Sequence, residues 1–163
     1  MAIRTRVGQG FDIHRFVDGL SDRVLVLGGV KFPGEKPLAG HSDADVIAHA
    51  AADALLGAAA LGDIGMHFPD TDPQWAGADS LTLLAHVAQL VRNAGYEIGN
   101  VDCSIVCEKP KIAPHRETMQ KLLSDAAGAT ITVKGRRAEG LGALGREEGI
   151  ACWAVAVIER TQA

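Results

Sequence analysis

The 163-residue chain has no apolar run near the roughly 20 residues that a membrane-crossing helix needs. Its first residues, Met-Ala-Ile-Arg-Thr-Arg, lack the apolar core of a secretion signal, so we expect a cytoplasmic protein. Positive charge is not in excess either, because 16 Lys and Arg stand against 20 Asp and Glu. A nucleic-acid surface needs clustered Lys and Arg, so the composition argues against nucleic-acid binding and indicates that any phosphate is bound locally.

Cysteines are few, and their number and spacing do not suit a disulfide framework. There are three, an odd number, which fits a reducing compartment. Cys103 and Cys107 lie four residues apart in a strand-like run, on one face but too far apart to form a disulfide. We expect them to be small buried hydrophobic residues.

The length and the 47% of hydrophobic residues predict a single domain over residues 1–163. Alternating and β-branched runs predict strands over residues 4–12, 23–31, 100–107, 130–137 and 150–159. Helical periodicity predicts helices over residues 43–60, 79–93 and 115–126. Adjacent helices and adjacent strands break a strict β-α alternation, so we expect an α+β fold with helices packed on one face of a mixed sheet.

The last predicted strand is apolar on both faces, because residues 150–158 read Ile-Ala-Cys-Trp-Ala-Val-Ala-Val-Ile. The face of the sheet without helices therefore needs a cover of its own. A self-associating oligomer would supply that cover.

A carboxylate and an imidazole lie two residues apart in Gly10-Phe11-Asp12-Ile13-His14, at the end of the first predicted strand. Strand side chains alternate between faces, so Asp12 and His14 point the same way. An isolated pair of this kind is more often a polar strand end in solvent. Residues elsewhere in the chain must decide between the two interpretations.

The helix that follows His41-Ser42-Asp43-Ala44-Asp45 is apolar nearly all round, with a single polar stripe of Asp45, His49 and Asp53. A stripe on a buried helix faces something polar inside the protein. Two imidazoles and one carboxylate, from His14, His49 and Asp12, match a catalytic zinc site with one open position. Asp45 or Asp53 would accept the other ring N–H of His49, and Ser42 with Asp45 predicts a capping box.

Two further segments carry charge and each has two interpretations. The loop over residues 61–73 holds Asp63, Asp70 and Asp72, which are either turn and cap residues or acceptors for substrate hydroxyls or Mg²⁺. The segment over residues 134–149 holds three arginines and five glycines. It is either a flexible charged turn or a phosphate site built from backbone amides and guanidinium groups.

The assembled motifs resemble those of the 2-C-methyl-D-erythritol 2,4-cyclodiphosphate synthase family over nearly the whole chain. The resemblance rests on motifs that are highly specific in combination: GFDIH at 10–14, GHSDAD at 40–45, HAxxDALLGAAALGDIG at 49–65, FPDTDP at 68–73, GADS at 77–80, PKIAPH at 110–115 and the run over 145–149.

The resemblance implies a phosphorus-oxygen lyase of non-mevalonate isoprenoid biosynthesis. In this family the 2-phosphate of a cytidine-diphosphate-linked methylerythritol attacks the β-phosphorus, closes a cyclic diphosphate and expels CMP. Zn²⁺ held by Asp12, His14 and His49 would face the β-phosphate, and Mg²⁺ or Mn²⁺ near Glu139 would bridge the α- and β-phosphates. The family also implies a homotrimer with active sites between subunits.

The resemblance also implies roles for individual residues. His41 would contact the 2-phosphate or the transition state together with Ser42. The implied substrate contacts further include Asp12, Ile13, His14, Asp63, Ile64, Gly65, Phe68, Pro69, Asp70, Thr71, Asp72, Arg136, Arg137, Ala138, Glu139 and Arg146. The implied cytidine pocket comprises Cys107, Glu108, Lys109, Pro110, Lys111, Ile112 and Ala113. The implied threefold-axis cavity, which can hold isoprenoid-like diphosphates, is surrounded by Phe11, Arg146 and Glu148.

The chain departs from the family pattern at Arg136-Arg137-Ala138, where the family usually has consecutive threonines, and at Glu147, which replaces a usual glycine. A threonine hydroxyl that stabilises the transition state is therefore missing. Arg137 either replaces it as a catalytic phosphate contact or points to solvent.

Two other functions compete with the cyclase. In a zinc-dependent phosphohydrolase, metal-bound water instead of the substrate's phosphate would be the nucleophile. An inactive trimer that binds isoprenoid diphosphates is the second alternative. The products formed from the cytidine-linked substrate discriminate among the three.

Overall fold

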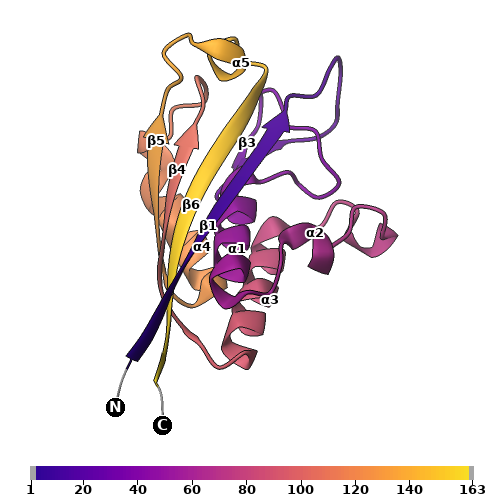
Figure 1. Cartoon of the computed structure of the whole chain (residues 1–163). Coiled ribbons are helices and arrows are strands. Elements are labelled where there is room, and N and C mark those ends of the chain that lie inside the picture. The colour runs from indigo at the N-terminus through magenta and orange to yellow at the C-terminus, as the bar shows by residue number, and fades with distance from the viewer. Residues whose placement is uncertain (1–2, 162–163) are drawn as a thin grey trace.

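The computed structural model describes residues 3–161 and is built around a four-stranded mixed sheet (Figure 1). The strand order is β1-β6-β4-β5, and the bounds are β1 (Ile3–Arg15), β6 (Gly149–Thr161), β4 (Glu97–Val106) and β5 (Thr130–Arg136). β4 and β5 run parallel, whereas β1 with β6 and β6 with β4 run antiparallel. The sheet is therefore mixed, as the sequence predicts.

Three longer helices lie on one side of this sheet: α1 (Val46–Ala59), α3 (Ser80–Asn93) and α4 (Arg116–Ala127). α1 packs on β1, β6 and β4, α4 packs on β5, and α3 packs on α1 and α4. The short helix α2 (Ile64–His67) and the 3₁₀ turn η1 (Pro73–Trp75) project beside them (Figure 1). The predicted α+β fold with helices on one face is confirmed. No helix within residues 3–161 is long and apolar enough to span a membrane.

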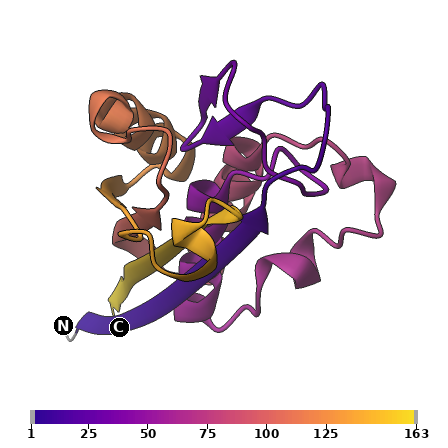
Figure 2. The same cartoon turned by 90° about the horizontal axis from the view of Figure 1, so that it is seen from above.

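The remaining elements are short and lie in the connections. η2 (Ala113–His115) precedes α4, and α5 (Gly142–Gly145) lies between β5 and β6. Seen from above, the start of β1 and the end of β6 lie side by side (Figure 2), in agreement with the pairing of Ile3 with Thr161. The three cysteines are all free and buried, which confirms the burial predicted for Cys103 and Cys107.

The single strand predicted over residues 23–31 is wrong. The structure has a hairpin there, with β2 (Leu25–Leu27) and β3 (Val30–Phe32) forming a separate two-stranded sheet. Gly28 and Gly29 both have positive φ, 57° and 76°, a conformation that glycine adopts readily. The chain therefore reverses direction at these two residues, where the alternation of side chains had suggested one continuous strand.

α1 begins differently from the predicted capping box. Asp45, not Ser42, is its N-cap, and the Asp45 carboxylate accepts hydrogen bonds from Ile47 N and Ala48 N. The same carboxylate also accepts Gly28 N at 2.9 Å and Gly29 N at 2.7 Å, and Asp45 is 0% exposed. Burial raises the pKa of Asp45 to about 6, although these glycine N–H groups favour the charged form. One buried carboxylate thus joins the hairpin to the first turn of α1.

The face of β1 and β6 that turns away from α1 carries exposed apolar side chains. Val7 is 65% exposed, Val155 46%, Phe11 42% and Trp153 41%. The rings of Phe11 and Trp153 lie 4.9 Å apart across the two strands. This open apolar face is the one for which the sequence predicts a covering partner.

Candidate metal centre and active site

The close approach of β1 to α1 positions the first two members of the candidate metal centre. A Cβ atom on Gly10 would lie 2.0 Å from Ala50 O, so only glycine lets the strand and the helix meet at this distance. Side chains two and four residues further along the same face are those of Asp12 and His14. They therefore emerge beside the helical turn that carries His49.

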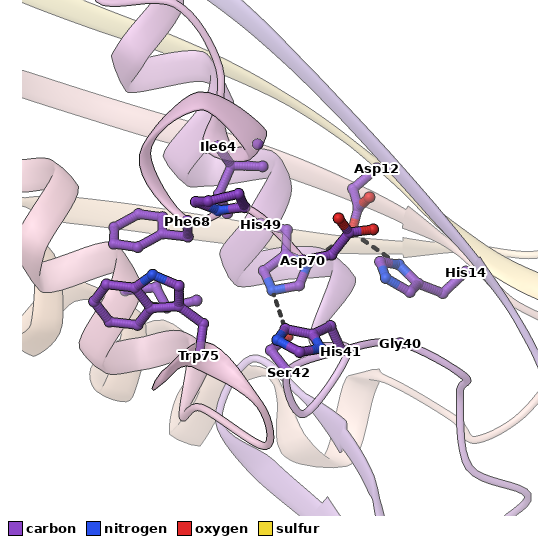
Figure 3. Close-up of a pocket in the computed structure, with 13 residues that line it drawn as sticks. Asp12, His14, Gly40, His41, Ser42, His49, Ile64, Phe68, Asp70 and Trp75 are labelled. Atoms are coloured by element: carbon purple, nitrogen blue, oxygen red, sulfur yellow. Dashed lines mark hydrogen bonds and ion pairs between the residues drawn. The ribbon is translucent and has the colours of Figure 1, made fainter. Parts of the chain in front are cut away.

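Asp12, His14 and His49 converge on one point (Figure 3). Asp12 Oδ2 lies 3.0 Å from His14 Nδ1 and 3.1 Å from His49 Nδ1, and one ligand atom from each residue lies within 4.8 Å of the others. The three side chains are between 10% and 23% exposed, so the point where they meet is shielded but reachable. Two nitrogens and a carboxylate oxygen at this spacing could hold a metal ion.

The hydrogen bonding of the centre also fits a metal ion. Among the residues that the structure describes, His14 Nδ1 is a buried side-chain nitrogen with no hydrogen-bond partner. Its 3.0 Å contact with Asp12 is close in distance but lacks hydrogen-bond angles. A buried nitrogen lone pair without a donor is costly, and a metal ligand bond would satisfy it.

The charges at the centre favour a cation. Burial would raise the pKa of Asp12, but its contacts with His14 and His49 lower it to about 2. Burial would lower the pKa of His49, yet the hydrogen bond and charge of Asp12, with the charges of Asp45 and Asp43, raise it overall. A proton and a metal ion thus compete for the same nitrogen, and metal binding weakens as the pH falls.

The expected acceptors for the second ring nitrogen of His49 are wrong. Asp45 faces the backbone N–H groups of the hairpin and of α1, and Asp53 accepts Ile64 N at 2.7 Å. His49 Nε2 instead lies 2.8 Å from Ser80 Oγ and 3.1 Å from Ser42 Oγ. Asp45, His49 and Asp53 do share one side of α1. The two carboxylates, however, accept hydrogen bonds from backbone N–H groups of other segments and not from the imidazole.

A cavity of about 450 Å³ opens beside the three ligands. Many of the residues implied as substrate contacts line it: Asp12, His14, His41, Ser42, Ile64, Gly65, Phe68, Pro69 and Asp70. Gly40, Trp75 and Leu83 also line it, although the sequence had not indicated them. Phe68 and Trp75 stack edge to face at 4.9 Å and form an apolar wall opposite the polar residues (Figure 3).

In the loop over residues 61–73, two of the three carboxylates cap short helical turns. Asp63 Oδ1 accepts Met66 N at the start of α2, and Asp72 Oδ1 accepts Gln74 N at the start of η1, each at 3.0 Å. The carbonyl of Asp72 lies 3.1 Å from His41 Nε2, whose N–H it can accept. Asp70 lines the cavity, whereas Thr71 is not among the lining residues. The side chain of Ile13 is 51% exposed, on the face of β1 opposite Asp12.

A second cavity of about 190 Å³ lies where the parallel strands β4 and β5 end. It is lined by six of the seven residues implied for cytidine, Lys109 being absent, together with Arg116, Gly135, Arg136 and Arg137. Burial and the charge of Glu108 raise the pKa of Cys107 to about 11, which keeps its thiol neutral. The sequence had not indicated Arg116. Helical periodicity assigns this residue to the start of a helix but does not state which residues of other segments lie beside it.

The other implied residues lie elsewhere. Glu139 and Ala138 line neither of these two cavities, and Ala138 N donates to Glu108 Oε1 at 2.7 Å. Arg146 lines a third cavity of about 280 Å³ and pairs with Glu148 at 2.8 Å. Their roles stay predictions.

Comparison with known proteins gives a consistent result across nearly the whole chain. A model of the YgbB family matches residues 5–159. A 2-C-methyl-D-erythritol 2,4-cyclodiphosphate synthase of Geobacillus thermodenitrificans is 52% identical over 161 residues, which are 97% of this chain and 99% of that protein.

Solved structures agree with the sequence relatives. IspF of Plasmodium falciparum, in a complex with CDP, has a TM-score of 0.82 and 34% identity, covering 97% of each chain. The bifunctional IspDF of Campylobacter jejuni has a TM-score of 0.91 and 36% identity, and the match covers 99% of this chain and 44% of the bifunctional one.

Proposed function

Because the chain belongs to the YgbB family of 2-C-methyl-D-erythritol 2,4-cyclodiphosphate synthases, we propose that ring closure takes place at the Asp12, His14 and His49 centre. These enzymes are metal-dependent lyases of isoprenoid biosynthesis by the non-mevalonate pathway. The observation that carries the assignment of the site is the convergence of three ligand atoms beside a cavity of about 450 Å³.

The substrate is 4-diphosphocytidyl-2-C-methyl-D-erythritol 2-phosphate. An oxygen of its 2-phosphate forms a bond to the β-phosphorus, and the bond from that phosphorus to the bridging oxygen breaks. CMP leaves with the bridging oxygen, so no water is consumed and the product is the cyclic diphosphate. This balance distinguishes the reaction from hydrolysis by a metal-bound water.

Asp12, His14 and His49 hold Zn²⁺, since two imidazoles and a carboxylate are the ligands of catalytic zinc. When bound, the ion neutralises charge on the phosphate under attack. Glu139 holds the second ion, Mg²⁺ or Mn²⁺, together with the substrate. His41 contacts the 2-phosphate from the wall of the cavity, where the Asp72 carbonyl orients its ring.

Each of the two cavities is assigned one part of the substrate. The methylerythritol part packs in the larger cavity, where Phe68 and Trp75 offer an apolar wall and Asp70 a hydroxyl acceptor. The cytidine part packs in the cavity at Cys107 to Ala113, in keeping with the CDP complex of a relative. We further propose that residues 1–163 act as one domain in this reaction.

Phosphorus NMR of the products tests this function. The purified protein with Zn²⁺ and Mg²⁺ is expected to convert the cytidine-linked substrate to a cyclic diphosphate and CMP, and a chelator is expected to stop the conversion. Open-chain phosphates would instead establish the phosphohydrolase. If the substrate stayed unchanged with every metal tested, both enzyme functions would be excluded and the inactive trimer that binds isoprenoid diphosphates would remain.

Arg137 replaces the missing threonine as a phosphate contact. It lines the second cavity beside Arg116 and Arg136, so the cavity proposed for the cytidine part also carries three arginines that could reach the attached phosphates. Loss of one charge-assisted contact costs about 1.5–3 kcal/mol, so Arg137→Ala is expected to lower kcat/KM about 10- to 100-fold. Steady-state kinetics measure this effect, with the exposed Arg4→Ala as the matched control. Equal kcat/KM values in Arg137→Ala and wild type would mean that Arg137 points to solvent.

The open apolar face supports assembly as a homotrimer. Val7, Phe11, Trp153 and Val155 are too exposed on one face for a protein that stays monomeric, and an oligomer interface would bury them. Sedimentation velocity of the wild type is expected to give a mass of three chains. Val155→Glu places a charge on this face and is expected to shift the mass to one chain. A monomeric wild type would contradict the trimer, and with it the isoprenoid cavity predicted around Phe11, Arg146 and Glu148.

A further inference from the structure

Ser80, the first residue of α3, lies between the metal centre and a second carboxylate. It is 1% exposed, and its Oγ is 2.8 Å from His49 Nε2. The same Oγ makes a short hydrogen bond to Asp43 Oδ1. His49, Ser80 and Asp43 therefore form a chain of hydrogen bonds that leads away from the ligand atoms.

The direction of each hydrogen bond follows from its partners. An ionised carboxylate only accepts, so the Ser80 hydroxyl must donate to Asp43. The Ser80 oxygen then offers a lone pair to His49, and the His49 proton must be on Nε2. With its proton there, a neutral imidazole has its lone pair on Nδ1, the nitrogen 3.1 Å from Asp12 Oδ2.

Asp43 is itself held in place. Its Oδ2 accepts Ser80 N at 3.1 Å, and its Oδ1 accepts Asp45 N at 3.2 Å. Two backbone donors from different elements thus keep the carboxylate aimed at the Ser80 hydroxyl. Ser42 is the less direct partner of His49, at 3.1 Å, and its Oγ also accepts Ala44 N.

The contacts of the Ser80 hydroxyl are not explained by helix capping. The N-cap of α3 is Asp79, whose carboxylate accepts Leu81 N at 2.8 Å. The Ser80 hydroxyl serves only the imidazole and Asp43 among the hydrogen bonds of the described residues. A buried hydroxyl with these two partners suits the role of orienting a metal-binding imidazole.

We propose that Asp43 and Ser80 are positioning residues that fix the tautomer of His49 so that Nδ1 receives the metal ion. The inference rests on the proposed metal centre. Partners of this kind orient a metal-binding imidazole and raise its basicity, and their loss typically lowers metal affinity about 10- to 100-fold.

Asp43→Asn is the most informative variant because it keeps the shape of the side chain. In Asp43→Asn an amide nitrogen replaces one of the two carboxylate oxygens, which accept the Ser80 hydroxyl and the backbone N–H groups of Ser80 and Asp45. The charge that holds the Ser80 proton away from His49 is lost, so the Nε2-protonated tautomer of His49 is no longer enforced. Chelator competition is expected to show Zn²⁺ affinity about 10- to 100-fold weaker in Asp43→Asn and in Ser80→Ala. Asp79→Ala, which removes the N-cap acceptor of α3 for Leu81 N but leaves the hydrogen-bond chain of His49, Ser80 and Asp43 in place, is the matched control and should keep the wild-type affinity.

Nitrogen-15 NMR of zinc-loaded wild type, labelled at histidine, tests the proposal without a substitution. The His49 proton is expected on Nε2, with the metal on Nδ1. A proton on Nδ1 would overturn the proposal, as would equal Zn²⁺ affinity in the wild type and both variants. A wild type that binds no Zn²⁺ would instead contradict the metal centre itself, so the two failures are distinguishable.

Discussion

Replacing His49 with alanine is expected to lower kcat/KM of ring closure by about 10³-fold or more, since metal stabilisation of the phosphate is worth several kcal/mol. His49 supplies one of three ligand atoms, and Asp12 and His14 alone leave the ion with two protein ligands on one strand. The substitution also leaves Ser80 without its imidazole partner in a buried site.

Metal analysis and the phosphorus NMR assay together check this expectation. His49→Ala should purify with far less zinc than wild type and should form little cyclic product at saturating substrate. His86→Ala removes an exposed imidazole of α3 and is expected to keep the zinc content of the wild type. A His49→Ala protein with both the zinc and the rate of the wild type would refute the metal centre.

Gly10→Ala is expected to destabilise the fold by about 3 kcal/mol or more, at the upper end of overpacking effects. The added Cβ would lie 2.0 Å from Ala50 O and 2.6 Å from Ala54 N. Both are backbone atoms of α1, so the strain cannot be relieved by rotating a side chain. β1 and α1 must separate, which also moves Asp12 and His14 away from His49.

Thermal denaturation of the metal-free protein measures this effect, with an expected fall in Tm of roughly 10 °C for a chain of this size. Gly57→Ala is the matched control on the same helix, where the added Cβ meets only Gln9 O at 3.8 Å. Alanine is the better helix former, so the control should be more stable by up to about 1 kcal/mol. If Gly10→Ala melted with the wild type, β1 and α1 would not be in the close contact described.

The members of the candidate metal centre could be identified before the structure because each lies in a regular element. Asp12 and His14 share a strand face by the two-residue period, and His49 stands out in a helix that is otherwise apolar. The mixed sheet and its helix-covered face followed from the same periodicities. The hairpin at Gly28 and Gly29 was missed because two three-residue strands are too short to show a period of their own.

The other wrong assignments concern hydrogen-bond partners. Asp45 and Asp53 are one helical turn from His49, and their spacing suggested a shared interaction. In the fold, each carboxylate faces backbone donors of another segment, Gly28 and Gly29 for Asp45 and Ile64 for Asp53. A helical period states which side chains share a face, but it does not state which groups of other elements reach that face.

By itself, the sequence determined the family, the fold class and the three residues that could hold a metal ion. These properties depend on residue types repeated at the periods of single elements and on motifs read along the chain. The tertiary structure alone decided that Ser80, 31 residues beyond His49, lies within hydrogen-bond distance of its second ring nitrogen, that Trp75 lines the cavity and that Asp45 caps α1. Such contacts arise when separate elements pack, because a buried donor or acceptor pairs with whichever group the packing brings within hydrogen-bond distance.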